Sequence, residues 1–472
     1  MSSFSGLSTA LSSLIAQRQA LEVAGQNISN ANTTGYTRQR VSMQAVEALS
    51  APTLYSTNKV AGQGVKVTSI DRIGDIFLDA RLRSETSGAA FHKAQAAALS
   101  QLETTMKEPA DTGVAAQLAQ FWASWQDVAN NPDDPAARKV LLGDATALTT
   151  RIASGYRAVE SQWDQARTEL DTMATEVNTT ATAVAHLNEQ IRSILVSGGS
   201  ANELMDQRSQ LVTKLSGLVG AEARERDDGT LDVMVAGNAL VRGVEAKAVT
   251  VVGSRVMTQA IAAAPNPDAV RLAWAANPDT PLALEGGTLA SHVANLAPGG
   301  LLANAAGRWN DLATTLRSSV NAVHTAAADL SGTTGREFFG TGAGPAATAL
   351  TVAITDANQI AAATPGKGAL DGSAADAMAQ LASSTTGPDA LWRAFVVDVG
   401  VQSRAATQRA GVTESARATA ETLQLSSASV DIDEETVNML AYQRAYEGAA
   451  RVMTAIDEML DVLINRTGVV GR

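Results

Sequence analysis

The sequence predicts a mainly α-helical protein, α+β overall, with a coiled coil of terminal helices, a long helical-bundle trunk and a small inserted β-rich domain. Only 4% of the 472 residues are aromatic, a balance that favours long Ala/Leu helices over a compact aromatic-rich core. Apolar residues recur at alternating spacings of three and four near both ends and in the middle of the chain. Between residues 222 and 300, short alternating runs bounded by turn residues replace this helical period.

The first helix carries a narrow apolar seam of coiled-coil type, interrupted at Arg18 and Gly25. A single seam of this kind is not stable alone in water, so it needs a partner helix. This N-terminal seam consists of Phe4, Leu7, Leu11, Leu14, Leu21 and Ile28.

A polar stretch, QNISNANTTGY at 26–36, follows this helix. We expect the helix to end here, because Asn tolerates the left-handed backbone conformation and can satisfy free backbone groups locally. The segment YTRQRVSMQ at 36–44 then alternates like an extended arm. An ordinary loop at the end of a helix would explain the asparagines, but not the complete sequence of the stretch 26–36.

The middle of the chain predicts a helical trunk. From Ile152 to Ile194, apolar residues alternate at spacings of four and three, which predicts one long helix. The sequence SGGSAN at 197–202 breaks the pattern, and Ser200 with Glu203 has the spacing of a capping box for the next helix. These two helices are expected to form an antiparallel hairpin. Further helical segments are expected at 87–129, 307–330 and 388–428.

The inserted β-rich region begins with a hairpin signal, the turn Asp228-Gly229 flanked by alternating apolar residues. Strand-like runs follow at 247–253 and 269–275. A second irregular stretch, 331–387, is rich in Gly, Ala and Thr. We expect it to fold against this insert and to contribute one strand.

The last helix repeats the seam pattern without a charged interruption. It is the simplest partner for the N-terminal seam and would join the two ends of the chain; alternatively, each end packs onto its own neighbouring domain. The acidic sequence DIDEET at 431–436 is expected to stabilise the start of this helix through the helix dipole. The C-terminal seam consists of Met439, Tyr442, Tyr446, Ala449, Met453, Ile456, Leu460 and Leu463.

We expect three domains from these patterns. They are a terminal-helix axial core with an extended arm (1–86 and 430–472), the helical trunk (87–221, 301–335 and 386–429), and a β-rich outer domain (222–300 and 336–385).

The sequence gives no positive reason to propose an enzyme, and we expect no catalytic, metal-binding or cofactor-binding residue. There is no cysteine, which excludes disulfides, zinc-thiolate sites and thiol nucleophiles. Simple avoidance explains this, and so does passage through an oxidising space. The histidines are scattered and lack neighbours at metal-ligand spacing. They are His92, His186, His292 and His324.

Charge and hydropathy exclude two classes of partner. The net charge of −12 argues against nucleic acid, because no basic patch is available to neutralise phosphates. No apolar segment is long enough to span a bilayer, and the N-terminus lacks the features of a cleavable signal peptide. A protein of this kind needs another route if it leaves the cell.

The N-terminal segment, from Ser5 to Val41, resembles the motif shared by the axial proteins of the bacterial flagellum, namely the rod, hook and hook-associated proteins. In that pattern the first helix ends at N-[IL]-[AS]-N-x-N-T-x-G-[YF]. The matching residues are Asn27, Ile28, Ser29, Asn30, Asn32, Thr33, Gly35 and Tyr36. Segments 121–152, 201–219 and 430–466 resemble, within that group, the hook-associated protein 1 family of the hook–filament junction.

The resemblance implies a structural subunit exported by the flagellar type III system without a cleaved signal and located outside the cell, at the hook–filament junction. It implies assembly through the terminal helices into an annular layer of copies. Hook subunits would lie below this layer, the second, filament-side junction protein above it, and an export chaperone would bind the C-terminal seam. Two alternatives remain: another axial protein, such as the filament-side junction protein or a hook subunit, and a secreted enzyme or adhesin on a helical stalk.

Overall fold

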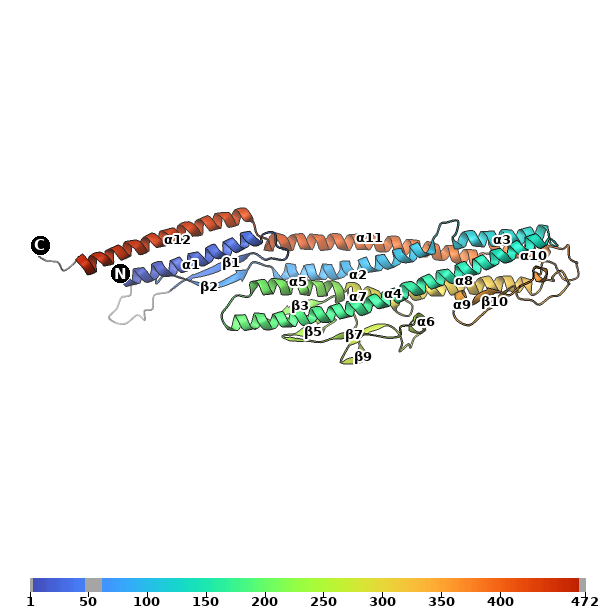
Figure 1. Cartoon of the computed structure of the whole chain (residues 1–472), viewed down its shortest axis with the longest axis horizontal. Coiled ribbons are helices and arrows are strands. Elements are labelled where there is room, and N and C mark those ends of the chain that lie inside the picture. Colours follow the sequence, from blue (N-terminus) through green and yellow to red (C-terminus); the bar gives the residue numbers. More distant parts are fainter. Residues whose placement is uncertain (1–2, 47–61, 467–472) are drawn as a thin grey trace.

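The computed structural model describes residues 3–46 and 62–466. The protein is a long rod built mostly of helices, with small antiparallel sheets along its side (Figure 1). The first and last helices lie together at one end of the rod. These features confirm the predicted mainly α-helical fold class.

The two ends of the chain pair with each other, as predicted. Helix α1 (Ser3–Asn30) packs along α12 (Ile432–Asp461), which continues into the short π-helix η3 (Val462–Arg466). The two helices are antiparallel, because Asn27 lies beside Glu435 and Gly6 lies beside Ile456. Strands β1 (Gln39–Ala45) and β2 (Val65–Arg72) form an antiparallel ribbon against α1.

The trunk contains the longest helices of the described chain. Helix α4 has 62 residues, and its predicted apolar row is buried at Ile152, Tyr156 and Trp163. The predicted hairpin between α4 and α5 is confirmed. The trunk helices are α2 (Ile76–Met106), α3 (Val114–Asn130), α4 (Pro135–Val196), α5 (Asn202–Val219), α7 (Gly287–Leu296), α8 (Leu301–His324) and α11 (Pro388–Ala428).

Aspartate side chains cap the N-termini of three long helices. The carboxylates of Asp75, Asp134 and Asp431 accept hydrogen bonds from the first free backbone amides of α2, α4 and α12. The capping box predicted for α5 is wrong. Ala201 occupies its N-cap position without a side-chain hydrogen bond, and Glu203 instead accepts a hydrogen bond from Gln39.

The few aromatic side chains are concentrated in the trunk. Trp309 on α8 packs against Trp392 on α11, with ring centroids 4.6 Å apart. Trp309 also lies directly on α4 at Gly155, where a β-carbon would overlap its ring. The single glycine therefore sets how closely α8 approaches the long helix.

The predicted β-rich insert lies along α4. The turn at Asp228-Gly229 joins the first two strands, as predicted, and Gly229 has a φ of 79°. Asn188 on α4 binds the backbone of the first sheet at Leu231, and Asn178 binds that of the second sheet at Val249. One sheet contains β3 (Glu222–Glu225), β4 (Leu231–Val235), β5 (Asn238–Arg242) and β6 (Glu245–Ala246), and the other contains β7 (Val249–Val252), β8 (Arg271–Trp274) and β9 (Asn277–Pro281), with α6 (Met257–Ala260) between β7 and β8.

The second irregular stretch does not fold against this insert. Its strands form a separate pair that packs on α4 and α8, at the end of the trunk away from the terminal helices (Figure 1). Buried Phe338 and Phe339 anchor it, because they pack against Phe121 of α3. Its elements are β10 (Phe339–Thr341), α9 (Ala346–Ala349), β11 (Leu350–Val352), η1 (Ala357–Gln359), α10 (Ser373–Ala379) and η2 (Gln380–Ser383).

Candidate assembly site: the terminal helices and their clasp

Helix α1 contacts α12 through small side chains. Its buried row differs from the predicted N-terminal seam and consists of Ala10, Ala16, Ala20, Val23 and Ala24. Small residues let two helix backbones approach closely. At Gly6, a β-carbon would lie only 3.1 Å from the Cδ1 atom of Ile456. The two terminal helices are therefore in close contact even near the start of α1.

The predicted N-terminal seam lies beside this alanine row. Leu7, Leu14, Leu21 and Ile28 are half-buried, and Leu11 is 51% exposed. The side chain of Phe4 lies outside the described residues. The alanines are therefore more deeply buried than the predicted leucines, and the role of the leucines as an assembly seam stays a prediction.

The predicted C-terminal seam lies on the face of α12 that meets α1. Ala449 and Ile456 are buried. Met439, Tyr442, Met453 and Leu460 are half-buried. Tyr446 and Leu463 are exposed. The predicted seam of α12 thus includes both buried apolar residues of this helix, Ala449 and Ile456.

Helices α1 and α12 are called the terminal pair below, and large apolar side chains on this pair also face solvent. On α1 these include Leu11 and Ile15, and on α12 they include Val437, Val452 and Met459. Several exposed large apolar side chains on one pair of helices are typical of a surface that binds another protein.

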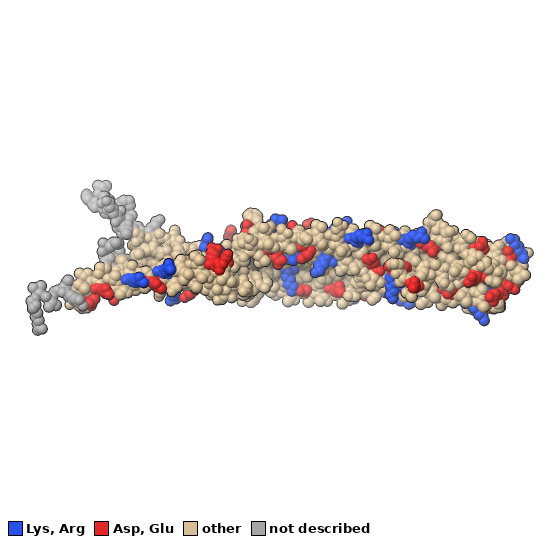
Figure 2. Space-filling model, turned by 90° about the horizontal axis from the view of Figure 1, so that it is seen from above, with Lys and Arg blue, Asp and Glu red and all other residues tan. Residues whose placement is uncertain are grey.

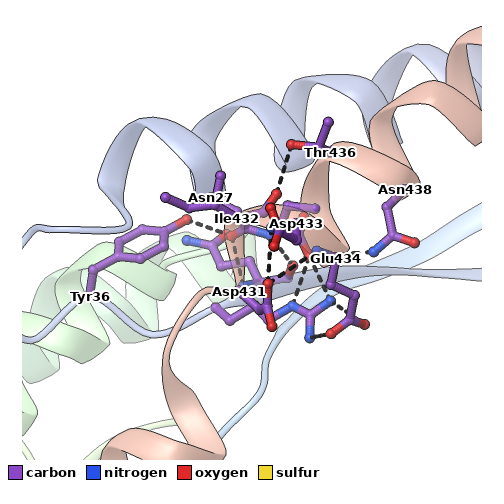
Figure 3. Close-up of polar contacts among 11 residues, drawn as sticks. Asn27, Tyr36, Asp431, Ile432, Asp433, Glu434, Thr436 and Asn438 are labelled. Atoms are coloured by element: carbon purple, nitrogen blue, oxygen red, sulfur yellow. Dashed lines mark hydrogen bonds and ion pairs between the residues drawn. The ribbon is translucent and has the colours of Figure 1, made fainter.

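A cluster of polar residues, here called the clasp, joins the terminal pair to the trunk. It consists of Asn27, Tyr36, Thr37, Arg38, Gln39, Arg72, Asn202, Glu203, Asp206, Glu434 and Glu435. Figure 3 shows the part around the start of α12.

Asn27 is the buried centre of the clasp, and it uses both ends of its amide. Its Nδ2 donates to the backbone oxygen of Gln39 (2.8 Å) and to Glu435 (3.0 Å). Its Oδ1 accepts from the Tyr36 hydroxyl (2.9 Å) and from the backbone amide of Gln39 (3.0 Å). Burial, followed by the charge of Glu203, raises the pKa of Tyr36 to about 12, so its hydroxyl remains a donor.

Arg38 connects the extended arm to the start of α12. Its guanidinium donates to both oxygens of Glu434 (2.8 and 3.0 Å) and to Glu435 (2.8 Å). Its backbone amide donates to Ala428 at the end of α11 (2.9 Å). The hydrogen bonds from Arg38 hold the pKa of the exposed Glu434 below its usual value.

Helix α5 supplies the trunk side of the clasp. Asp206 accepts from the backbone amide of Thr37 (3.0 Å) and lies 2.7 Å from an Nη atom of Arg72. Burial is the largest influence on Asp206 and raises its pKa, while Arg72 opposes this shift. The Gln39 side chain donates to Glu203 and accepts from Asn202, both at 3.0 Å. The clasp therefore brings together parts of the chain that lie far apart in sequence.

The remaining residues of the family motif shape the turn after α1. Asn30 donates to the backbone oxygen of Gln26 (3.0 Å), and Ser29 and Thr33 also make local hydrogen bonds. Asn32 is exposed. The expectation that an asparagine adopts the left-handed conformation is wrong: Gly35 does so, with a φ of 79°. A β-carbon at Gly35 would overlap Gln210, whose amide donates to Thr34 (2.9 Å).

Sequence reasoning missed the charged members of the clasp. Asp431 caps α12, and Glu434 and Glu435 lie in its first turn, as the helix-dipole expectation requires. No signal in the sequence indicates that the two glutamates also bind Arg38. Asp206 gave no local signal, because its partner Thr37 is 169 positions away. The adjacency of Arg38 to the motif is the one signal that the sequence offered.

The described residues offer no metal site. They contain no group of three or more His, Asp or Glu side chains that could hold a metal ion. Buried His324 has a structural contact on each ring nitrogen, to the backbone of Arg336 (2.7 Å) and of Ala361 (2.9 Å). Within the same residues, no helix has both the length and the apolar character to cross a membrane.

Comparison with known proteins identifies the family. The family model described as the flagellar hook-associated protein FlgK helical domain matches residues 99–339. Flagellar hook-associated protein 1 of Bacillus subtilis is 30% identical over 515 aligned residues that cover all of both chains. The chain belongs to the flagellar hook-associated protein 1 family. It is a structural protein of the flagellum, at the hook–filament junction, and this decides against the other axial proteins considered above.

Further comparisons within the hook-associated protein 1 family agree. The Escherichia coli member is 32% identical over 52% of this chain and 45% of its own length. The structure of the flagellar hook junction protein from Burkholderia pseudomallei is 16% identical and shares the fold, with a TM-score of 0.64 over 75% of this chain and all of that one. Models of flagellar basal body rod proteins match residues 7–37 and 424–466, the segments that contain Asn27, Glu434 and Glu435.

Proposed function

We propose that the terminal pair is the part of the molecule through which it assembles in the flagellum. Copies would form an annular layer, with hook subunits below and the second, filament-side junction protein above. The exposed apolar residues on both terminal helices are the observation that carries this proposal. Covering such surface stabilises an assembly by about 25 cal/mol per Å².

The clasp supports this role, because it fixes the terminal pair to the trunk. Salt bridges and buried hydrogen bonds connect α12, the extended arm and α5 at one place. We propose a division of labour in which 1–86 with 430–472 makes axial contacts, while 87–221, 301–335 and 386–429 form the supporting trunk. Regions 222–300 and 336–385 would form outer surface, at two separate places on the trunk.

We also propose export by the flagellar type III system without a cleaved signal, and an export chaperone that binds the C-terminal seam before assembly. Ala449 and Ile456 are buried in this chain, where α12 faces α1. A chaperone on this seam must therefore displace α1, so that chaperone binding and terminal pairing exclude each other. Purified chaperone would bind a variant lacking residues 1–30 more tightly than the full chain.

The assembly proposal is tested by two matched Val→Asp variants. Val452 on α12 and Val140 on α4 are each 52% exposed, so neither substitution buries a charge in the monomer. We expect the Val452→Asp protein to be missing from purified flagella and the Val140→Asp protein to be present. The thermal unfolding temperature of both monomers should equal that of the wild type. Incorporation of Val452→Asp at the wild-type level would overturn the proposal.

A further inference from the structure

Two uncharged helix faces lie at opposite edges of the trunk. In the middle of the rod α11 packs on α2, α2 packs on α5 and α7, and these pack on α4. Helix α11 and the C-terminal half of α4 are therefore on opposite sides, with other helices between them (Figure 1).

The face on α4 is a row of exposed threonines. The residues are Thr168, Thr172, Thr175, Thr179 and Thr182, spaced alternately by four and three. Each hydroxyl donates to the carbonyl four residues earlier, at 2.9 to 3.1 Å. Because the hydroxyls are satisfied within the helix, the row presents methyl groups to a neighbouring molecule. A groove of about 760 Å³ lined by Leu187 and Leu211 continues this face between α4 and α5.

The face on α11 has the same character. Val412, Ser415, Thr419 and Leu423 are exposed and are spaced by three, four and four. Val412 is 64% exposed and Leu423 is 42% exposed. Figure 2 shows the rod from above, where wide uncharged areas separate the charged side chains. The α4 row thus has heptad spacing, and the α11 row follows the period of the helix, so each row lies along one face of its helix.

Hydrogen bonds fix which residues of the two faces lie at the same level along the rod. The Gln162 side chain of α4 donates to the backbone oxygen of Ala98 on α2. On α11, Ser403 donates to Glu103 of α2 and Gln424 donates to Asp79 of α2. Counting along the antiparallel helices at about 1.5 Å per residue places Val412 level with Thr168 and Leu423 level with Thr179, to within about one turn.

The charges beside the two faces are complementary. Arg409 lies one turn before Val412, and Asp164 lies one turn before Thr168. Both side chains are exposed, and neither makes a salt bridge within the described residues. By the same count these two residues lie at one level of the rod.

We propose that the α11 face of one copy packs against the α4 threonine face of the next copy, with Arg409 beside Asp164 of the partner copy. The contact joins two different surfaces on opposite edges, so it is heterologous and can close a ring. It rests on the proposed assembly of copies in an annular layer and names the lateral surfaces that join them.

Paired cysteines test this contact directly, because the chain contains no cysteine of its own. In purified flagella, T168C/V412C and T179C/L423C should each form disulfide-linked ladders under oxidation, since a disulfide needs Cα atoms about 4.4–6.8 Å apart. The mismatched pair T179C/V412C, about 16 Å out of level, should yield on the order of tenfold less. Single-cysteine variants should stay monomeric, because the contact is heterologous.

Two results would overturn this inference. Dimers from single-cysteine variants would indicate a symmetric contact, and absence of ladders from variants present in the flagella would exclude these faces. The Val452→Asp variant tests only assembly through the terminal pair, whereas the cysteine pairs test only the lateral contact. The two proposals can therefore fail separately. A charge exchange gives a second measure: Arg409→Asp or Asp164→Arg should each lower the ladder yield, and the double variant should restore it.

Discussion

Asn27 has the most demanding hydrogen-bonding role at the scale of single residues. It satisfies the backbone of Gln39 in both directions, and it also binds Tyr36 and Glu435. An aspartate at this position would lose the amide donor, and an alanine would lose all four of these side-chain hydrogen bonds. The buried Glu435 carboxylate would then keep only Arg38 (2.8 Å) and the longer hydrogen bond from Asn438 (3.5 Å) among the described residues.

Substitution Asn27→Ala is expected to lower the free energy of opening the start of α12 by about 1–3 kcal/mol, because buried polar groups lose their partner. Hydrogen exchange of the amides after Glu435 measures this opening. Asn32→Ala is the control, because that motif residue is exposed and should change nothing. Equal effects of the two substitutions would contradict the role of Asn27.

The contact between Arg38 and Glu434 makes the clasp sensitive to acid. Because Arg38 lowers the pKa of Glu434 in the folded state, its stabilisation is present above the ordinary pKa and disappears as the pH falls through the lowered value. The thermal unfolding temperatures of wild type and Glu434→Gln should therefore differ at neutral pH and converge once the pH falls below the lowered pKa of Glu434. A difference that grows on acidification would show that the sign is wrong.

At the scale of elements, residue spacing predicted the buried face of a helix well where that face carries the bulkiest side chains. In α4 and α12 the predicted rows include the buried residues Trp163 and Ile456, because bulky side chains fill the contact. In α1 the leucine row has heptad spacing, whereas the most buried apolar residues do not repeat regularly. Spacing and side-chain size both indicated the leucines, but the alanines are more deeply buried. The clasp could not be predicted, since Glu435 and Asn27 are 408 positions apart.

Two glycines of α4 test how the trunk is packed. Gly155→Ala should destabilise the protein by about 1–3 kcal/mol, because the new methyl group overlaps the ring of Trp309. Gly143 has open space at its β-carbon position, so Gly143→Ala should stabilise by about 0.5–1 kcal/mol. Denaturant unfolding of both variants measures the contrast. The packing account fails if Gly155→Ala is as stable as Gly143→Ala.

At the scale of the whole molecule, a trunk of packed helices holds a terminal pair that has few other partners among the residues that the structure describes. Helices α1 and α12 extend beyond the trunk and cover mainly each other, with the β1–β2 ribbon along α1 (Figure 1). Such a pair opens more easily than the trunk, because local stability follows the number of buried apolar contacts. Neighbouring molecules of the junction would supply the missing contacts.

Hydrogen exchange of the soluble monomer and of the same protein in purified flagella tests this claim most directly. We expect residues 3–30 and 432–461 to exchange much faster than residues 136–196 in the monomer, and to become as protected as the trunk in the flagellum. Terminal helices that are equally protected in both states would contradict assembly through the terminal pair.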